Sequence, residues 1–212
     1  MKQNMKELNT YIWDLDGTLL DSYDCIVTSL VNLAGEYRMS DSYANIMMTV
    51  KRGSVSSYLR DLSWKTSVDF EQLFERYREL SGEHLNEISL MPGALETLTA
   101  LRDRGVEHFV YTHRGKSTKP ILDRLGITEF FKEIVTYENG FKLKPSGDGV
   151  KYLVSKYGLV KPETAYVGDR TRDVYCARDA GVKAILYMPA DSCIPLTGVE
   201  DCIIRKLTDL IE

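Results

Sequence analysis

The stretch YIWDLDGTLLDS, Tyr11–Ser22, places two aspartates one residue apart directly after an apolar run. Aspartate is a poor strand former, and two carboxylates this close repel one another. We predict that Tyr11–Asp14 is a buried strand and that Asp14 and Asp16 stand at its end for a chemical reason. Asp-Gly between hydrophobic residues is also a hairpin signal, so the stretch taken alone leaves an ordinary turn open.

Four further strands are predicted downstream, each a short run of β-branched or aromatic residues, at 106–112, 133–137, 164–169 and 182–188. Helical patterns lie between them, and Gly105, Gly126, Gly158 and Gly181 are placed to end these helices. Alternating strands and helices indicate an α/β fold, a Rossmann-like doubly wound parallel sheet with helices on both faces.

The segment between the first two predicted strands is helical in pattern. Ile26, Leu30, Ala34 and Tyr37 share one helix face, and a second helix follows a Thr66-x-x-Asp69 capping signal. We interpret residues 21–88 as a small helical domain inserted into an α/β domain made of 1–20 and 89–212. The alternative is one larger α/β layer, because periodicity shows helices but not how they dock.

Composition limits the class of protein. With 43% hydrophobic and 27% charged residues, the 212-residue chain can bury a sizeable core, and its net charge of -4 argues against a nucleic-acid partner. No apolar run approaches the roughly 18 residues of a membrane span, and the first residues lack a secretion signal. Four cysteines without a CxxC pair favour reduced thiols in the cytoplasm over a zinc site.

Chemistry-bearing residues gather at the predicted strand ends, where doubly wound sheets bind ligands. These residues are Asp14, Asp16, Thr112, Lys144, Asp169 and Asp173. Carboxylates that converge need a cation, and hard oxygen ligands suit Mg²⁺. A lysine and a hydroxyl are the groups expected around a phosphate beside that metal.

The opening stretch can then supply both a nucleophile and a proton carrier. Asp14 can attack phosphorus to form an aspartyl-phosphate, and Asp16 can protonate the leaving oxygen and later deprotonate water. Gly17 allows a sharp turn, and Thr18 is expected to hold that turn through its hydroxyl.

Four motifs in order resemble those of the haloacid dehalogenase-like hydrolase superfamily: DLDGT (14–18), Thr112 after a hydrophobic strand, Lys144-Pro145 and GDRTRD (168–173). The helical insert resembles the cap of the phosphoglycolate phosphatase and β-phosphoglucomutase branch. The resemblance implies that Asp14, Asp169 and the backbone carbonyl of Asp16 bind Mg²⁺. It also implies that Thr112 and Lys144 bind the phosphoryl group, and that Asp173 supports the metal or the lysine.

Some positions depart from this pattern. His113 stands where the family commonly has asparagine, and we expect His113, with Arg114 and Lys116, either to face the phosphate or to lie in a solvated loop. Gly147 stands close to where many relatives carry proline. The run Gly115-Lys116-Ser117 mimics a P-loop but lacks the earlier glycine, because Val110 occupies that position.

Within the insert, Lys51, Arg52 and Gly53 interrupt the helical pattern. They are expected to form either a loop that reaches an anionic substrate or a solvated basic turn.

The sequence therefore predicts a Mg²⁺-dependent phosphatase that acts on a small phosphorylated metabolite. The alternative is a mutase that transfers a phosphoryl group within a sugar phosphate. A non-catalytic regulatory module is less favoured, because no motif residue is missing. The identity of the phosphate ester and the oligomeric state stay open.

Overall fold

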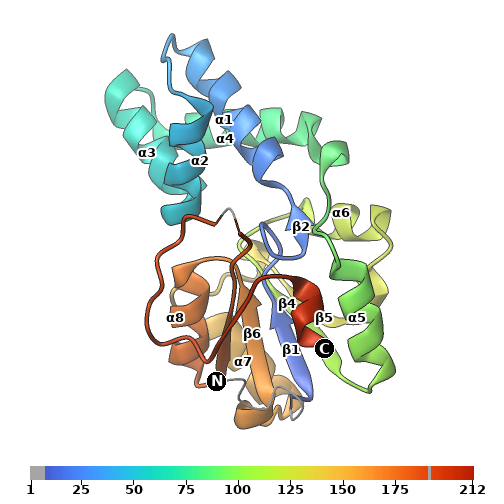
Figure 1. Cartoon of the computed structure of the whole chain (residues 1–212). Helices are drawn as coiled ribbons and strands as arrows, with labels where there is room; N and C mark the ends of the chain where they lie inside the picture. The colour runs from blue at the N-terminus through green and yellow to red at the C-terminus, as the bar shows by residue number, and fades with distance from the viewer. Residues whose placement is uncertain (1–7, 191) are drawn as a thin grey trace. The chain divides into compact units, whose positions relative to one another are not determined.

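The computed structural model describes residues 8–190 and 192–212, which form two compact units (Figure 1). One unit contains the chain up to Leu20 together with Leu90–Glu212, and the other is Asp21–Ser89. The chain passes between them at β2 (Leu20–Asp21) and β3 (Ser89–Leu90), which pair with each other. Each unit has its own cluster of buried apolar side chains.

The first unit is built on a six-stranded parallel sheet with the order β5-β4-β1-β6-β7-β8. Its strands are β1 (Thr10–Trp13), β4 (Glu107–Tyr111), β5 (Phe131–Val135), β6 (Thr164–Gly168), β7 (Lys183–Tyr187) and β8 (Cys202–Ile204). β1 is central and buried along its whole length. Trp13 pairs with Val110 on one side and Val167 on the other, so the carboxyl ends of β1, β4 and β6 lie at one edge.

Helices cover both faces of this sheet (Figure 1). They are α5 (Ala94–Asp103), α6 (Thr118–Arg124), α7 (Asp148–Tyr157) and α8 (Thr171–Ala180). Side chains of α7 and α8 share a buried cluster with Ile12 and Tyr166, while α5 packs along β4. The predicted Rossmann-like doubly wound fold is confirmed.

The predicted strands of this sheet are shifted by one or two residues at their ends, β1 being Thr10–Trp13 rather than Tyr11–Asp14, and two strands differ most. β5 ends at Val135, because Thr136 caps a short 3₁₀ helix, η4 (Tyr137–Asn139), through its side chain. β8 is a three-residue edge strand that the sequence does not signal, since a strand this short has no readable alternation. The other 3₁₀ turns among the described residues of this unit are η3 (Thr128–Phe130), η5 (Lys161–Glu163) and η6 (Leu207–Leu210).

The second unit consists of α1 (Tyr23–Glu36), α2 (Tyr43–Arg52), α3 (Val55–Thr66) and α4 (Phe70–Glu83), followed by η2 (Leu85–Glu87). α1 packs against α2 and α4, and α3 packs against α2 and α4. Its core includes the fully buried side chains of Leu30, Leu33, Ile46, Leu59 and Leu73.

Two local predictions in this unit are wrong. Thr66 is the last residue of α3, and Asp69 alone caps α4 by accepting the Glu71 N–H. Lys51 and Arg52 form the last turn of α2 rather than a loop, and the helix stops at Gly53. Lysine and arginine are good helix formers and are favourable at a helix C-terminus, so only the glycine interrupts the pattern.

Every helix in the described ranges is too short or too polar to cross a bilayer.

Candidate active site

The turn after β1 is held by the backbone. The Asp14 N–H donates to the Val167 carbonyl (2.9 Å), which ties the end of β1 to β6. Gly17 has a φ of +78°, and the Leu20 N–H returns to the Leu15 carbonyl (2.8 Å). The expected hydrogen bond from Thr18 is wrong, because its buried hydroxyl oxygen has no partner among the described residues. Thr18 is nevertheless fully buried.

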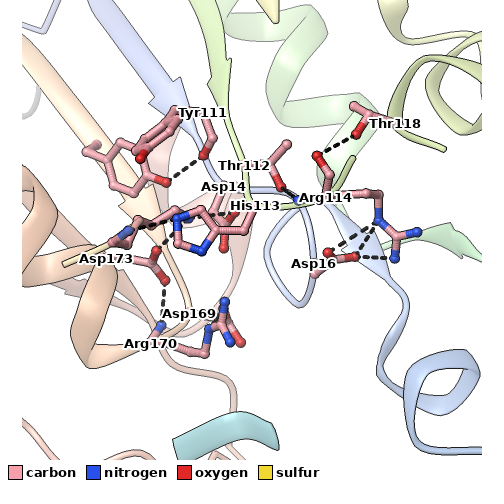
Figure 2. A network of polar contacts seen from close by, with 12 residues as sticks. Asp14, Asp16, Tyr111, Thr112, His113, Arg114, Thr118, Asp169, Arg170 and Asp173 are labelled. Atoms are coloured by element: carbon pink, nitrogen blue, oxygen red, sulfur yellow. Dashed lines mark hydrogen bonds and ion pairs between the residues drawn. The ribbon is translucent and has the colours of Figure 1, made fainter. Parts of the chain in front are cut away.

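Three of the predicted carboxylates lie together. Asp14 follows β1, Asp169 follows β6, and Asp173 is in the first turn of α8, and one oxygen from each lies within 4.8 Å of the others (Figure 2). Their side chains are buried, with residue exposures of 2%, 6% and 1%. Residues distant in the sequence therefore form one buried acidic cluster at the edge of the sheet.

Lys144 enters this cluster as a buried cation. Its Nζ lies 2.8 Å from Oδ1 of Asp14 and 2.8 Å from Oδ1 of Asp173. The ammonium also lies over two aromatic rings, 5.6 Å from that of Tyr111 and 5.2 Å from that of Tyr166. The Tyr166 hydroxyl donates to the Tyr111 carbonyl (2.7 Å), and the Tyr111 hydroxyl donates to the Lys142 carbonyl (2.9 Å).

The two tyrosines have a role that the sequence analysis missed. Tyr111 lies one residue before Thr112, and Tyr166 lies three residues before Asp169. In the sequence, an aromatic residue within a strand looks the same whether it fills the hydrophobic core or contacts a site residue.

The cluster holds three carboxylates against the cations Lys144 and, beside Asp169, Arg170. Burial raises the pKa of Asp14 and the charge of Asp173 adds to this, while Lys144 opposes both. Burial by itself would lower the pKa of Lys144, but the charges of Asp14 and Asp173 outweigh it and raise that pKa. The second carboxylate oxygen of Asp14, Oδ2, is buried without a hydrogen-bond partner among the described residues. Three convergent oxygen donors and one such orphan oxygen fit a hard divalent ion such as Mg²⁺.

Thr112 and His113 follow β4 at the same edge. Thr112 is buried, and its hydroxyl accepts the Arg114 N–H (3.1 Å). Nε2 of His113 accepts the backbone N–H of Lys144 (2.8 Å), so this ring supports the lysine loop. Burial, together with Lys144 and two arginines, lowers the pKa of His113 to about 2, and the imidazole is neutral. Phosphate binding by His113 stays a prediction.

Asp16 lies outside the acidic cluster. Figure 2 shows its carboxylate turned toward Arg114, whose Nη2 lies 2.6 Å from Oδ1. Arg114 belongs to the loop after β4, so this contact joins the turn after β1 to the next strand's loop. The sequence analysis placed Arg114 only as a candidate to face phosphate and did not pair it with Asp16.

Lys51 and Arg52 belong to the helical unit. The Lys51 ammonium lies over the Tyr23 ring, 5.0 Å from its centre. Arg52 lines an open pocket of about 430 Å³ between α2 and α3, together with Asp41, Tyr58 and Lys65 among others. A role for either residue in substrate recognition stays a prediction.

Known proteins resemble this chain over most of its length. A phosphoglycolate phosphatase from Haemophilus influenzae (strain 86-028NP) is 27% identical over 184 residues, which cover 82% of each chain. Pyrophosphatase PpaX from Oceanobacillus iheyensis is 26% identical over 208 residues, covering 96% of this chain and 95% of the relative.

A crystal structure of a "predicted phosphoglycolate phosphatase" from Haemophilus somnus 129PT superposes with a TM-score of 0.84 at 24% identity, with 97% of each chain covered. At this identity the superposition speaks for the fold alone. The sequence itself matches the profile of the haloacid dehalogenase-like hydrolases over residues 11–187. The chain therefore belongs to the haloacid dehalogenase-like hydrolase family and is an enzyme of its phosphatase branch.

Proposed function

We propose that this enzyme is a Mg²⁺-dependent phosphatase that hydrolyses a small phosphorylated metabolite through a phosphoryl group carried on Asp14. The observation that carries the proposal is the buried meeting of Asp14, Asp169 and Asp173 with Lys144 at the sheet edge. Such a cluster supplies oxygen ligands for a metal, a nucleophile and a cation for a phosphate in one place.

The proposed reaction has two steps. In the first, a carboxylate oxygen of Asp14 attacks phosphorus, the bond from phosphorus to the ester oxygen breaks, and that oxygen takes a proton from Asp16. In the second, water attacks the same phosphorus, the bond to Asp14 breaks, and Asp16 takes a proton from the water. Phosphate is released and both aspartates return to their starting states, so the cycle needs no other reactant.

The remaining residues bind and orient. Asp14, Asp169 and the backbone carbonyl of Asp16 would hold Mg²⁺, with Asp173 in support; the bound ion would neutralise charge on the phosphoryl oxygens. Lys144 and Thr112 would bind the phosphoryl group, and Tyr111 and Tyr166 keep the lysine in place. We propose further that the helical unit acts as a cap that excludes water from the reaction.

A phosphate-release assay with and without added Mg²⁺ tests the proposal. The panel contains phosphoglycolate and pyrophosphate, for which two relatives are named, together with sugar phosphates, nucleotides and p-nitrophenyl phosphate. We expect phosphate release that a metal chelator abolishes. A sugar phosphate that is isomerised without releasing phosphate would identify a mutase instead.

Asp14→Asn is the decisive variant, because an amide oxygen of nearly the same shape does not form the acyl phosphate. Its activity should fall by at least ~10⁴-fold, as expected when a covalent nucleophile is removed. Asp103→Asn, which removes the same charge from an exposed residue at the end of α5, should leave the activity unchanged. Undiminished turnover in Asp14→Asn would eliminate the proposed mechanism.

A further inference from the structure

The contact between Arg114 and Asp16 is an ion pair with three hydrogen bonds. Nε and Nη2 of the guanidinium lie 3.0 Å and 2.6 Å from Oδ1 of Asp16, and Nε lies 3.3 Å from Oδ2. The side chains are only 7% and 18% exposed. An exposed pair of this kind contributes little, but a largely desolvated guanidinium fork fixes the plane of the carboxylate that it holds.

The arginine is itself fixed by its neighbours. Its Nη1 donates to the Ser117 hydroxyl (3.2 Å), and its backbone N–H donates to the Thr112 hydroxyl (3.1 Å). Its carbonyl accepts the Thr118 hydroxyl (3.3 Å) and the Tyr137 N–H (3.2 Å). Arg114 is therefore anchored to the start of α6 and to the loop after β5, and it presents a rigid fork to Asp16.

We infer that Arg114 is the positioning residue for Asp16, an inference that rests on the proposed function. Asp16 lies in the turn after β1 and precedes Gly17, which has a positive φ. Asp16 lies outside the named strands, in an isolated bridge with Leu20, so the sheet does not direct its carboxylate. Arg114 directs it: the guanidinium bonds mainly to Oδ1, and Oδ2 is the oxygen that carries the proton given in the first step and taken up in the second.

The two proton transfers depend on the substrate in different ways. An alkyl phosphate expels an alkoxide, which needs the Asp16 proton as the phosphorus–oxygen bond breaks. p-Nitrophenyl phosphate expels p-nitrophenolate, which leaves without a proton. In the second step water must lose a proton to Asp16 whichever ester was used. Misplacing Asp16 therefore impairs the first step for alkyl esters only and the second step for both.

Arg114→Met tests this inference, because methionine has a similar length but neither the charge nor the fork. We expect kcat/KM for the alkyl phosphate that is hydrolysed fastest in the panel to fall by on the order of 10²-fold. For p-nitrophenyl phosphate, kcat/KM should fall by less than about threefold, while kcat falls strongly. Stopped-flow measurement should show a burst of about one equivalent of p-nitrophenolate before slow turnover.

The variant Asp16→Asn shows the ester-dependent loss of kcat/KM that is expected when the proton carrier itself is removed. Adding Arg114→Met to Asp16→Asn should leave the ratio of alkyl to aryl kcat/KM unchanged, since the arginine then has no proton carrier to position. Arg178→Met removes an ion pair with Asp201 from the same unit and should leave all rates unchanged. If Arg114→Met does not fold, Arg114→Lys, which keeps the charge without the fork, should show the same ester-dependent loss.

Equal losses of kcat/KM on both esters, without a burst, would show that Arg114 only connects the two loops. This result would overturn the inference about Arg114 and leave the proposed function standing. Absence of phosphate release from every ester by the unaltered enzyme would instead overturn the proposed function, and the inference with it.

Discussion

Lys144 shows how much a single buried charge decides in this protein. Its ammonium is completely buried, yet it remains protonated because Asp14 and Asp173 each lie 2.8 Å away. Two carboxylates and one ammonium leave an excess negative charge, and the third carboxylate, Asp169, has Nε of Arg170 3.9 Å from its Oδ1. The lysine therefore stabilises the folded state by offsetting repulsion among the buried carboxylates, in addition to its proposed role in phosphate binding.

Lys144→Met should destabilise the protein more than loss of an exposed lysine. Removing one partner of a buried ion pair leaves uncompensated charge, which typically costs about 3–5 kcal/mol. We expect a loss of this order in urea denaturation without Mg²⁺, and partial recovery when Mg²⁺ is added. Lys65→Met, which removes a partly exposed pair with Asp61, should change the free energy of unfolding little. Equal losses in the two variants would contradict the electrostatic role given to Lys144.

At the scale of elements, the connection from β6 to α8 places two of the three clustered carboxylates. Gly168 ends β6, Asp169 follows it, and Asp173 lies in the first turn of α8. The Asp173 carboxylate also accepts the Arg170 N–H (3.0 Å), so it caps the helix while it contacts Lys144. One side chain thus couples the start of a helix to the acidic cluster.

Gly168→Ala should damage the site through this connection. A Cβ at Gly168 would lie 2.4 Å from the Cβ and Cγ of Asp173, so the carboxylate or the backbone must move. We expect phosphatase activity to fall by at least ~10²-fold, as for a displacement of about 1 Å in a catalytic constellation.

Gly82→Ala in α4 is the matched control for this variant. A Cβ there meets nothing within 4 Å, so both activity and stability should be retained. Full activity in Gly168→Ala would show that the close packing of Asp173 is not needed for the reaction.

Across the whole molecule, the central strands bury a histidine that the proposed reaction does not use. His108 on β4 is 1% exposed, and its Nδ1 accepts the indole N–H of Trp13 on β1 (3.1 Å). Burial lowers the pKa of His108 to about 4 from its ordinary 6.5. Between these two pH values the unfolded chain binds a proton that the folded protein excludes, so stability must fall as the pH falls from 6.5 toward 4.

His108→Gln should weaken this acid sensitivity. Glutamine keeps an oxygen that can accept from Trp13 but does not titrate. Between pH 7.5 and pH 5 the unaltered protein should lose about 2 kcal/mol more of its unfolding free energy than the variant. Urea denaturation at the two pH values measures the difference, and identical losses in both proteins would show that His108 titrates normally.

Local patterns in the sequence were enough to predict much of this architecture. Alternating strand and helix signals predicted the parallel sheet, and the glycines at 105, 126, 158 and 181 each lie in the left-handed conformation just after a helix. The parallel arrangement then brings strand ends to one edge, so the meeting of Asp14, Asp169 and Asp173 follows from topology. β8 was not predicted because a three-residue edge strand is too short to show the alternation of apolar and polar residues that marks a strand.

The sequence by itself determined where most strands lie and therefore which residues stand at their ends. Strand and helix formation depend largely on neighbours along the chain, so local patterns reveal them. Only the tertiary structure decided the partners of these residues: Arg114 with Asp16, 98 residues apart, His113 with the Lys144 backbone, and the tyrosine rings around the Lys144 ammonium. Such pairs depend on side-chain direction and burial after packing, and any cation in a sequence has several carboxylates that it could reach.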